Sequence, residues 1–254
     1  MASREEQKRK LREEREAAQR ADASAAERRK RTAYLAGGIG LIALIVVVAL
    51  VLVSQAGDDS GDTVQAENLF AGIPQKGVTL GDPDAPVTVV EYGDLQCEFC
   101  RAFAIDDLPG ILKDYVKPGD VKMELRLVAF LGPDSETGRG VAAGAAEQSL
   151  IWPFAENVYN NQQGENTGYM NTEFLTEQLS AVKGMDVQAA LAVPGTEAAQ
   201  QYAAESDRLA QEAGVNGTPT FTVTPDGGET KNVSAAELPG AIDDALAETD
   251  SSSG

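Results

Sequence analysis

The chain has 254 residues, enough for one or two domains with a buried core, and a formal net charge of −19. This charge is uneven. Residues 1–33 hold 11 Lys and Arg against 7 Asp and Glu, whereas the part from Ser54 onward holds 10 against 33. A strongly acidic domain repels the phosphates of nucleic acids, so we expect no nucleic-acid partner.

The chain contains no histidine and only two cysteines. Without histidine, Ser-His-Asp and Cys-His mechanisms are excluded. A structural zinc site needs about four protein ligands, and two cysteines would supply only half of them. We therefore expect no metal site.

An uncharged run follows a charged N-terminal tail. Residues 1–32 are rich in Arg, Lys, Glu, Gln and Ala, which predicts a solvated tail. Residues 33–53 form an uncharged run of 21 residues. As a helix this run would reach about 30 Å, the thickness of the hydrocarbon core of a membrane. The run is therefore a candidate transmembrane helix.

The basic residues around this run predict its orientation. They crowd its N-terminal side, and none follows it until Lys76. The positive-inside rule therefore places the tail in the cytoplasm and the rest of the chain outside. A cleaved signal peptide is the alternative, because Ser54-Gln55-Ala56 weakly resembles a cleavage site. The long apolar run and long basic region favour a retained single-pass anchor.

Residues 54–71 are rich in Gly, Asp and Ser, which predicts an acidic flexible linker. A folded domain is expected over residues 72–248, with a disordered tail over 249–254. In the first part of this domain, Val87–Tyr92 reads as a buried strand, and alternating apolar residues over Val121–Phe130 predict a second one. A helix between them should reach about Val116, with a break or kink at Pro109-Gly110.

The apolar period becomes helical over about residues 134–213, which predicts an all-helical insertion. Two or three helices are expected up to Gly184, with Asn171 or Thr172 capping the last of them, and another helix over about 197–213. The aromatic residues of this segment are expected to form its core. They include Trp152, Phe154 and Tyr159.

The end of the domain returns to strands. A strand should follow Pro219, and a Pro-Asp-Gly-Gly turn should join it to an antiparallel partner over Thr230–Val233. Ser234-x-x-Glu237 is a capping box for a last helix toward Leu246. The order is strand, helix, strand, helical insertion, two strands and a helix. It indicates an α/β thioredoxin-like fold with an inserted all-helical domain.

The two cysteines, Cys97 and Cys100, form a C-x-x-C pair where the first helix should begin. A thiol at a helix N-terminus faces unsatisfied N–H groups and the positive end of the helix dipole, which favours its thiolate. The second cysteine lies one turn further on, close enough to close a disulfide. A disulfide that closes so short a loop stabilises a fold little. Redox chemistry is therefore a better interpretation of the pair than a structural disulfide.

Two segments carry a resemblance to a known family. The segment before and including the cysteines resembles the active-site strand of the DsbA-like branch of the thioredoxin superfamily; it reads Ala85-Pro86-Val87-Thr88-Val89-Val90-Glu91-Tyr92-Gly93-Asp94-Leu95-Gln96-Cys97-Glu98-Phe99-Cys100. Gly214-Val215-Asn216-Gly217-Thr218-Pro219-Thr220-Phe221 resembles that family's cis-proline loop. The resemblance covers about Gly77–Ala247 and implies a thiol–disulfide oxidoreductase of the bacterial envelope.

The resemblance also implies roles for single residues. Cys97 would be the exposed cysteine that forms the mixed disulfide, and Cys100 its buried resolving partner. Pro219 would be a cis-proline opposite Cys97, with the Thr218 backbone pairing with a bound peptide. Glu91 would be a buried acid beneath the site that accepts a proton from Cys100, unless it points to solvent from its strand. Asp94, in the loop, is a weaker candidate for that role.

The dipeptide between the cysteines departs from the family. Strongly oxidising members often carry a histidine where this chain has Phe99, and Glu98 adds a negative charge. Arg101 either offsets this charge in part or faces solvent. We therefore expect Cys97 to be less acidic than the reactive cysteine of the strongest oxidants, which titrates near about 3.5.

These features predict a membrane-anchored enzyme that exchanges a Cys97–Cys100 disulfide with cysteines of secreted or envelope proteins, with no other cofactor. An oxidase is favoured, reoxidised by a membrane redox partner that the family implies. One alternative is a reductase or isomerase of the envelope, to which the missing histidine gives weight. The other is a non-enzymatic tethered module that binds peptides beside Pro219.

Overall fold

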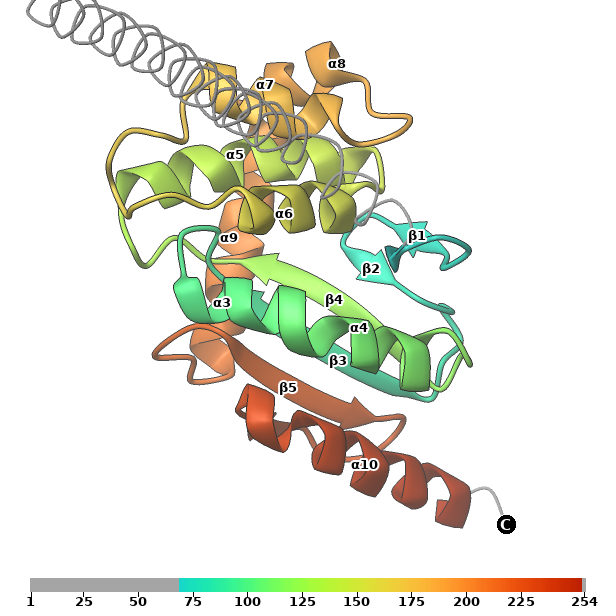
Figure 1. Ribbon diagram of the computed structural model, residues 1–254. Coiled ribbons are helices and arrows are strands. Elements are labelled where there is room, and N and C mark those ends of the chain that lie inside the picture. The colour runs from blue at the N-terminus through green and yellow to red at the C-terminus, as the bar shows by residue number, and fades with distance from the viewer. Residues whose placement is uncertain (1–68, 253–254) are drawn as a thin grey trace, which may run out of the picture. The chain divides into compact units, whose positions relative to one another are not determined.

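A computed structural model describes residues 69–252 (Figure 1). The predicted tail over 1–32, the apolar run over 33–53 and linker residues 54–68 lie outside the described residues. Within the described range, no helix is both long and apolar enough to cross a membrane. Phe70 is 5% exposed, and its ring centre lies 6.4 Å from that of Trp152. The linker prediction is therefore wrong at its end, because Phe70 packs into the domain core.

The described strands form a six-stranded sheet in the order β1-β2-β4-β3-β5-β6. The central strands, β3 (Val87–Gly93) and β4 (Val121–Leu127), are parallel. The other neighbouring pairs are antiparallel, and these strands are β1 (Gln75–Lys76), β2 (Thr79–Leu80), β5 (Thr220–Pro225) and β6 (Lys231–Val233). The sequence analysis did not predict β1 and β2, since two-residue strands carry no detectable period.

One continuous helical segment begins between the two cysteines, as predicted, and it is irregular around Pro109. It consists of α3 (Glu98–Ala102), the π turn η1 (Phe103–Asp107), α4 (Leu108–Ile111) and the π turn η2 (Leu112–Val116). A proline inside a helix lacks a donor, and its ring crowds the carbonyl four residues earlier. The wider turn of η1 just before Pro109 accommodates the ring.

The predicted helical insertion over 134–213 is confirmed, with five helices in place of the three or four expected. They are α5 (Pro133–Glu147), α6 (Ile151–Asn160), α7 (Thr172–Ser180), α8 (Val187–Ala192) and α9 (Glu197–Glu212). Asn171 is the N-cap of α7, because its side chain accepts a hydrogen bond from the N–H of Phe174 at 3.1 Å. Trp152, Phe154 and Tyr159 are buried, as predicted.

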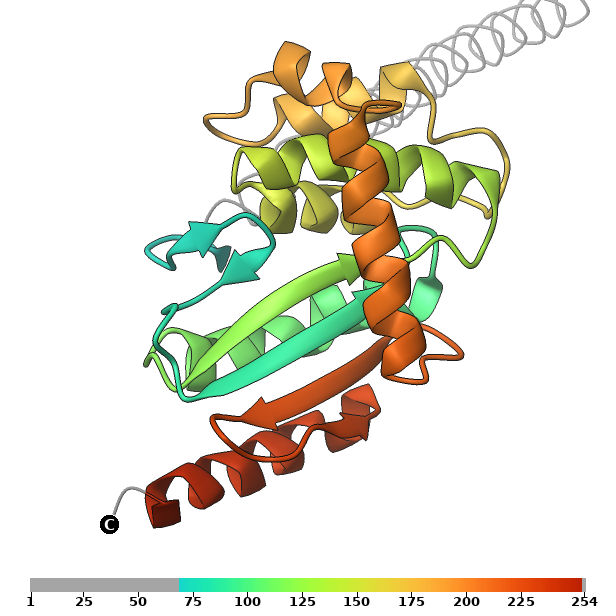
Figure 2. The same ribbon diagram turned by 180° about the vertical axis from the view of Figure 1, so that it is seen from behind.

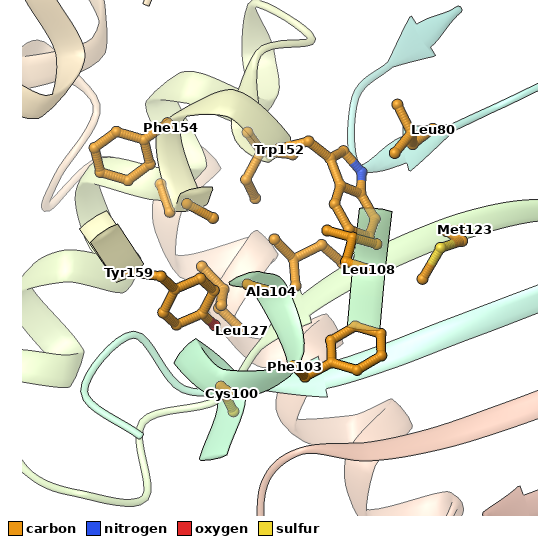
Figure 3. Close-up of a cluster of buried hydrophobic side chains, with 14 of the residues drawn as sticks. Leu80, Cys100, Phe103, Ala104, Leu108, Met123, Leu127, Trp152, Phe154 and Tyr159 are labelled. Atoms are coloured by element: carbon orange, nitrogen blue, oxygen red, sulfur yellow. The ribbon is translucent and has the colours of Figure 1, made fainter. Parts of the chain in front are cut away.

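Helices pack on both faces of the sheet. The α3–η2 segment covers one face together with α10 (Leu238–Ser252), and α9 crosses the opposite face (Figures 1 and 2). Helices α5 to α8 form a layer beside the sheet. The main core joins side chains of the sheet, the α3–η2 segment and α6 in one cluster, part of which Figure 3 shows. The helical insertion and the sheet therefore share one hydrophobic core.

The C-terminal helix begins as predicted and ends later. The Ser234–Glu237 capping box is present before the short 3-10 turn η3 (Ala235–Glu237), which leads into α10. The prediction of a disordered tail from residue 249 is wrong for residues 249–252, which continue α10 to Ser252. Polar side chains of this last turn bond back to the helix: Ser251 donates to the Ala247 carbonyl at 2.8 Å, and Thr249 to that of Leu246 at 2.8 Å.

The contact between α5 and α8 yields a testable prediction. A Cβ added to Gly144 would overlap the Ala190 carbonyl oxygen and lie 2.8 Å from the Ala190 Cα. Because backbone atoms cannot move aside cheaply, we expect Gly144→Ala to lower the free energy of unfolding by about 1–3 kcal/mol. Denaturant unfolding measures this change.

The matched control is Gly110→Ala. A Cβ at Gly110 meets no atom within 4 Å, so alanine should stabilise its helix by about 0.5–1 kcal/mol. A Gly144→Ala protein as stable as the parent chain would contradict the close approach of the two helices.

Candidate active site

The C-x-x-C pair lies where the loop after β3 leads into α3. Cys97 is the N-cap of α3 with an extended backbone (φ −73°, ψ 120°), and Cys100 follows one turn later. Both cysteines are free thiols. Cys100 is fully buried, as predicted, but Cys97 is only 6% exposed, so its predicted exposure is wrong. The loop that contains Thr218 lies against the Cys97 sulfur and limits the access of solvent to it.

The predicted proximity of this loop to Cys97 is confirmed. The peptide bond between Thr218 and Pro219 is cis, as expected. The Cys97 thiol Sγ donates a hydrogen bond to the Thr218 carbonyl oxygen at 3.2 Å. Antiparallel pairing of β3 with β5, in which Tyr92 faces Thr220, carries the loop to this position. The sheet register therefore brings together two motifs separated by 121 positions.

The surroundings of Cys97 favour its thiolate. The pKa of Cys97 is lowered to about 6. The largest cause is a hydrogen bond from Cys100, while burial acts in the opposite direction. Hydrogen bonds from the Thr218 side chain and from the N–H groups of Cys100 and Phe99 also lower this pKa. In the reduced form this thiolate stabilises the fold. That contribution is complete above the ordinary thiol pKa and is lost as the pH falls through about 6.

Cys100 has the opposite environment. Burial is the main cause that raises its pKa well above the ordinary thiol value, and the hydrogen bond to Cys97 and the Cys97 and Glu91 charges raise it further. The N–H of Asp94 donates to its sulfur at 3.5 Å and acts in the other direction. Near neutral pH the pair therefore holds one thiolate and one thiol, which is the arrangement needed for sequential disulfide exchange.

Glu91 lies beneath the cysteines, as predicted, and the alternative that it points to solvent is wrong. It is 2% exposed. Burial, followed by the charges of Glu156 and Cys97, raises the pKa of Glu91 to about 8. Glu91 therefore holds a proton near neutral pH, beside a thiol that must gain and lose one. Sequence analysis missed Glu156, which is 6% exposed on α6.

Asp94 does not face the sulfur chemistry but holds the loops around it. Its carboxylate accepts hydrogen bonds from the N–H groups of Gln96 (2.9 Å), Phe130 (2.9 Å) and Leu131 (3.1 Å), and from the Ser135 hydroxyl (2.6 Å). This carboxylate ties the cysteine loop to the segment between β4 and α5. The structure therefore gives Asp94 a positioning role, in line with its lower rank as a proton acceptor.

The end of α6 and the loop after it also fix the cysteine turn. Gln162 donates through its side-chain amide to the carbonyls of Leu95 (2.9 Å) and Cys97 (3.2 Å). Arg101 is exposed, and its Nε donates to the Tyr159 carbonyl at 3.0 Å. The helical insertion therefore supports the redox turn, a role that the sequence analysis did not predict.

The dipeptide between the cysteines faces solvent. Glu98 is exposed, and Phe99 is 67% exposed. The pKa of Cys97, at about 6, lies above the value near 3.5 of the strongest oxidants, and the Glu98 charge is not among the causes that shift it. The individual roles of Glu98 and Phe99 stay predictions. Within residues 69–252, no cluster of three or more His, Cys, Asp or Glu side chains is arranged to hold a metal ion.

The fold and the site together define a thioredoxin-like protein built for thiol–disulfide exchange. The family model described as Thioredoxin matches residues 74–244. A Bacillus anthracis protein named "Probable disulfide bond formation protein D" is 31% identical over 214 residues, which covers 81% of this chain and 92% of that protein. The chain therefore belongs to the thioredoxin family, in its DsbA-like branch, and is a protein thiol–disulfide oxidoreductase.

Solved structures agree on the fold. Oxidised BdbD from Bacillus subtilis superposes with a TM-score of 0.60 at 24% identity and covers 68% of this chain and 97% of its own. A thioredoxin-like oxidoreductase from Silicibacter pomeroyi superposes with a TM-score of 0.52 at 27% identity, over 70% of this chain and 96% of its own. The α/β fold with a helical insertion is thus shared with these two proteins.

The hydrogen bond from the Thr218 side chain to Cys97 yields a second prediction. Thr218→Val keeps the shape of the side chain and removes the donor, so the pKa of Cys97 should rise from about 6. One hydrogen bond contributes about 0.5–1.5 kcal/mol, so the rise should be up to about one pH unit. The ultraviolet absorbance of the thiolate, followed against pH in the reduced protein, measures it.

Thr220→Val is the control, because the Thr220 hydroxyl donates to the Gly217 carbonyl at 2.7 Å and is not among the groups that lower the Cys97 pKa. A Thr218→Val protein that titrates as the parent chain does would show that the donor has no part in stabilising the thiolate.

Proposed function

We propose that this chain is a membrane-anchored oxidoreductase that acts outside the cytoplasm and passes a Cys97–Cys100 disulfide to cysteines of secreted or envelope proteins. The observation that carries the proposal is the 3.2 Å contact between Cys97 Sγ and the Thr218 carbonyl, beside a second, buried thiol. The name of the Bacillus anthracis relative, a probable disulfide bond formation protein, supports an oxidase. The uncharged run over residues 33–53 supports a membrane anchor with the catalytic domain outside.

The first step is attack of a substrate thiolate on Cys97 Sγ. The Cys97–Cys100 bond breaks, a bond between the substrate sulfur and Cys97 forms, and Cys100 leaves with the electron pair. Because Cys100 is buried and its pKa is raised, its thiolate is unstable there and takes a proton from Glu91. Glu91 can supply it, since its pKa of about 8 keeps it protonated near neutral pH.

The second step releases the oxidised substrate. A second substrate thiolate attacks the substrate sulfur of the mixed disulfide, and Cys97 leaves as a thiolate. The lowered pKa of Cys97 makes it the better leaving group of the two cysteines. Two electrons thus pass from the substrate dithiol to the Cys97–Cys100 pair. Reoxidation then requires an electron acceptor, for which we propose a membrane redox partner; the proposal needs no cofactor beyond the redox-active disulfide.

The loop at Thr218 and Pro219 would bind the substrate backbone. When Cys97 is protonated, its thiol donates a hydrogen bond to the Thr218 carbonyl. A mixed disulfide has no S–H, so this carbonyl becomes free to accept an N–H from the bound peptide, as in strand addition. Phe99 (67% exposed) and Phe130 (51%) are large exposed apolar side chains in the described part of the chain. Both belong to segments tied to the cysteine loop and would contact apolar substrate residues.

The pKa of Cys97 leaves a reductase or isomerase as the second candidate. Its value of about 6 lies between those of DsbA, about 3.5, and thioredoxin, about 7. Since a stabilised thiolate favours the reduced form, we expect a reduction potential between their values of about −120 and −270 mV. Equilibration with glutathione buffers measures it. A pair that rests oxidised in cells supports the oxidase, and a largely reduced pair supports the reductase.

The third prediction is that Cys100→Ala traps substrates. Without the resolving thiol, Cys97 should hold its client as a mixed disulfide that survives non-reducing gel electrophoresis and is released by a reductant. Mass spectrometry of the released partners should identify secreted or envelope proteins with cysteines.

The control is the double variant Cys97→Ser, Cys100→Ala, which should trap nothing. A Cys97→Ser chain that keeps its full cellular role would contradict an exchange enzyme and favour a peptide-binding module. Cytoplasmic clients in the trapped set would contradict the proposed location.

A further inference from the structure

A small cavity of mixed polar and apolar lining lies between the sheet and α6, next to Glu91. Two carboxyl groups and a phenol line it, from Glu91 on β3 and from Glu156 and Tyr159 on α6. The remaining lining is apolar and consists of Ala104, Leu108, Leu125, Trp152 and Ala155. The volume open to the centre of a water molecule is about 10 Å³. This volume is near the minimum needed to hold one water.

Gly93 lies close to two residues of this lining, Tyr159 and Glu91, and to the resolving cysteine. A Cβ on Gly93 would lie 3.0 Å from the Tyr159 hydroxyl, 3.4 Å from Glu91 Oε1 and 3.8 Å from Cys100 Sγ. A phenol, a carboxyl and the resolving sulfur thus border one space about the size of an atom. In Figure 3, Tyr159 and Cys100 belong to the same buried cluster. A side chain at Gly93 would fill the space that these three groups share.

The Tyr159 hydroxyl is buried and has no hydrogen-bond partner in the described part of the chain. Leaving a buried polar group without a partner is costly, so most such groups bond to protein atoms or to ordered water. Tyr159 lines, with Glu91 and Glu156, a cavity whose volume is near the minimum for one water. These three groups could all bond to the same water molecule.

In the described part of the chain, no cation pairs with the two carboxyl groups. Among residues 69–252, no ion pair includes Glu91 or Glu156. The charged residues on the elements that pack against α6 are exposed or half-buried; they are Glu98 and Arg101 on α3, Asp106 and Asp107 on η1, Asp134, Glu136, Arg139 and Glu147 on α5, and Glu173 and Glu177 on α7. Two buried carboxylates without a cation do not both ionise readily, so the pair retains a proton.

Glu156 is the member of this pair nearer to solvent. It is 6% exposed against 2% for Glu91. Its Oε1 accepts a hydrogen bond from the Asn160 side chain at 3.3 Å, and Asn160 is partly exposed at the end of α6. Burial raises the pKa of Glu156 to about 7, so it gains and loses protons near neutral pH. A proton on Glu156 can therefore exchange with solvent more easily than one on Glu91.

We propose that Glu156 is a proton-relay residue that, through a water bound by the Tyr159 hydroxyl, returns a proton to Glu91 after Glu91 has protonated Cys100. The proton enters from solvent at Glu156, crosses the cavity to the Glu91 carboxylate and replaces the proton delivered to the Cys100 sulfur. The reverse reaction runs the same path outward. No electrons move in these steps. This inference rests on the proposed function, because it assumes that Cys100 alternates between disulfide and thiol.

The test is the rate at which Cys100 resolves a mixed disulfide of Cys97 with glutathione, measured against pH in the parent chain and in Glu156→Gln. Glutamine keeps the size and the bond from Asn160 but holds no exchangeable acid. We expect the rate at pH 7 to fall about tenfold, a small share of the ~10²- to 10⁴-fold typical of general acid–base catalysis. In the parent chain the pH profile of this rate should show two steps, from Glu91 and Glu156. In Glu156→Gln only one step should remain, which a merely structural change would not cause.

Infrared spectroscopy provides a second readout, since Glu156→Gln should remove one of two protonated carboxyl bands. The matched control is Glu177→Gln, an exposed glutamate on α7, which should leave both measurements unchanged. A Glu156→Gln protein with the parent rate and pH profile would overturn the proposal. If that variant does not fold, Tyr159→Phe replaces it, with an expected loss of about threefold, and the parent rate there would overturn the proposal instead.

The two proposals fail in different ways. If Cys100→Ala traps no client in cells while Glu156→Gln still slows resolution with glutathione, the relay stands and the proposed cellular function is wrong. If clients are trapped and Glu156→Gln resolves at the parent rate, the function stands and the relay is wrong.

Discussion

The contact between the Cys97 sulfur and the Thr218 carbonyl is the constraint on which the rest of the site depends. It joins the first turn of α3 to the loop before β5, two segments 121 positions apart. The central sheet fixes their distance: because β3 and β5 pair antiparallel, the loop after β3 and the loop before β5 lie at the same end of the two strands. The same loop shields Cys97 and supplies one of the hydrogen bonds that favour its thiolate. Geometry and reactivity therefore have one structural origin.

The two cysteines differ because the fold gives them different surroundings. Cys97 receives hydrogen bonds from Cys100, from Thr218 and from backbone N–H groups at the start of α3, whereas Cys100 lies in the core next to Glu91. The first setting stabilises a negative sulfur and the second opposes it. Exchange in either direction needs this difference, since one sulfur must attack or leave while the other holds a proton. The direction in cells then depends on the potential of the pair and on its partners.

Local patterns in the sequence predicted much of this site, and long-range packing explains the rest. The strand that ends before Cys97, the buried Glu91 and the cis-proline loop follow from two contiguous motifs and a family resemblance. Glu156 could not be found in this way, because its helix shows only an apolar pattern and nothing local marks its approach to Glu91. The burial of Cys97 was missed for a similar reason, since a loop from the other side of the insertion covers it. The helical insertion, predicted as a separate core, shares its core with the sheet and supplies part of the site.

The central claim is that one cysteine of the pair is a thiolate near neutral pH and the other a protonated thiol. The most direct measurement is the alkylation rate of each cysteine in the reduced protein as a function of pH, with the modified residue identified by mass spectrometry. The account predicts that Cys97 reacts first, with a midpoint near pH 6, while Cys100 stays unmodified through neutral pH. Reaction at Cys100 first, or a Cys97 midpoint near the ordinary thiol value of about 8.5, would contradict it.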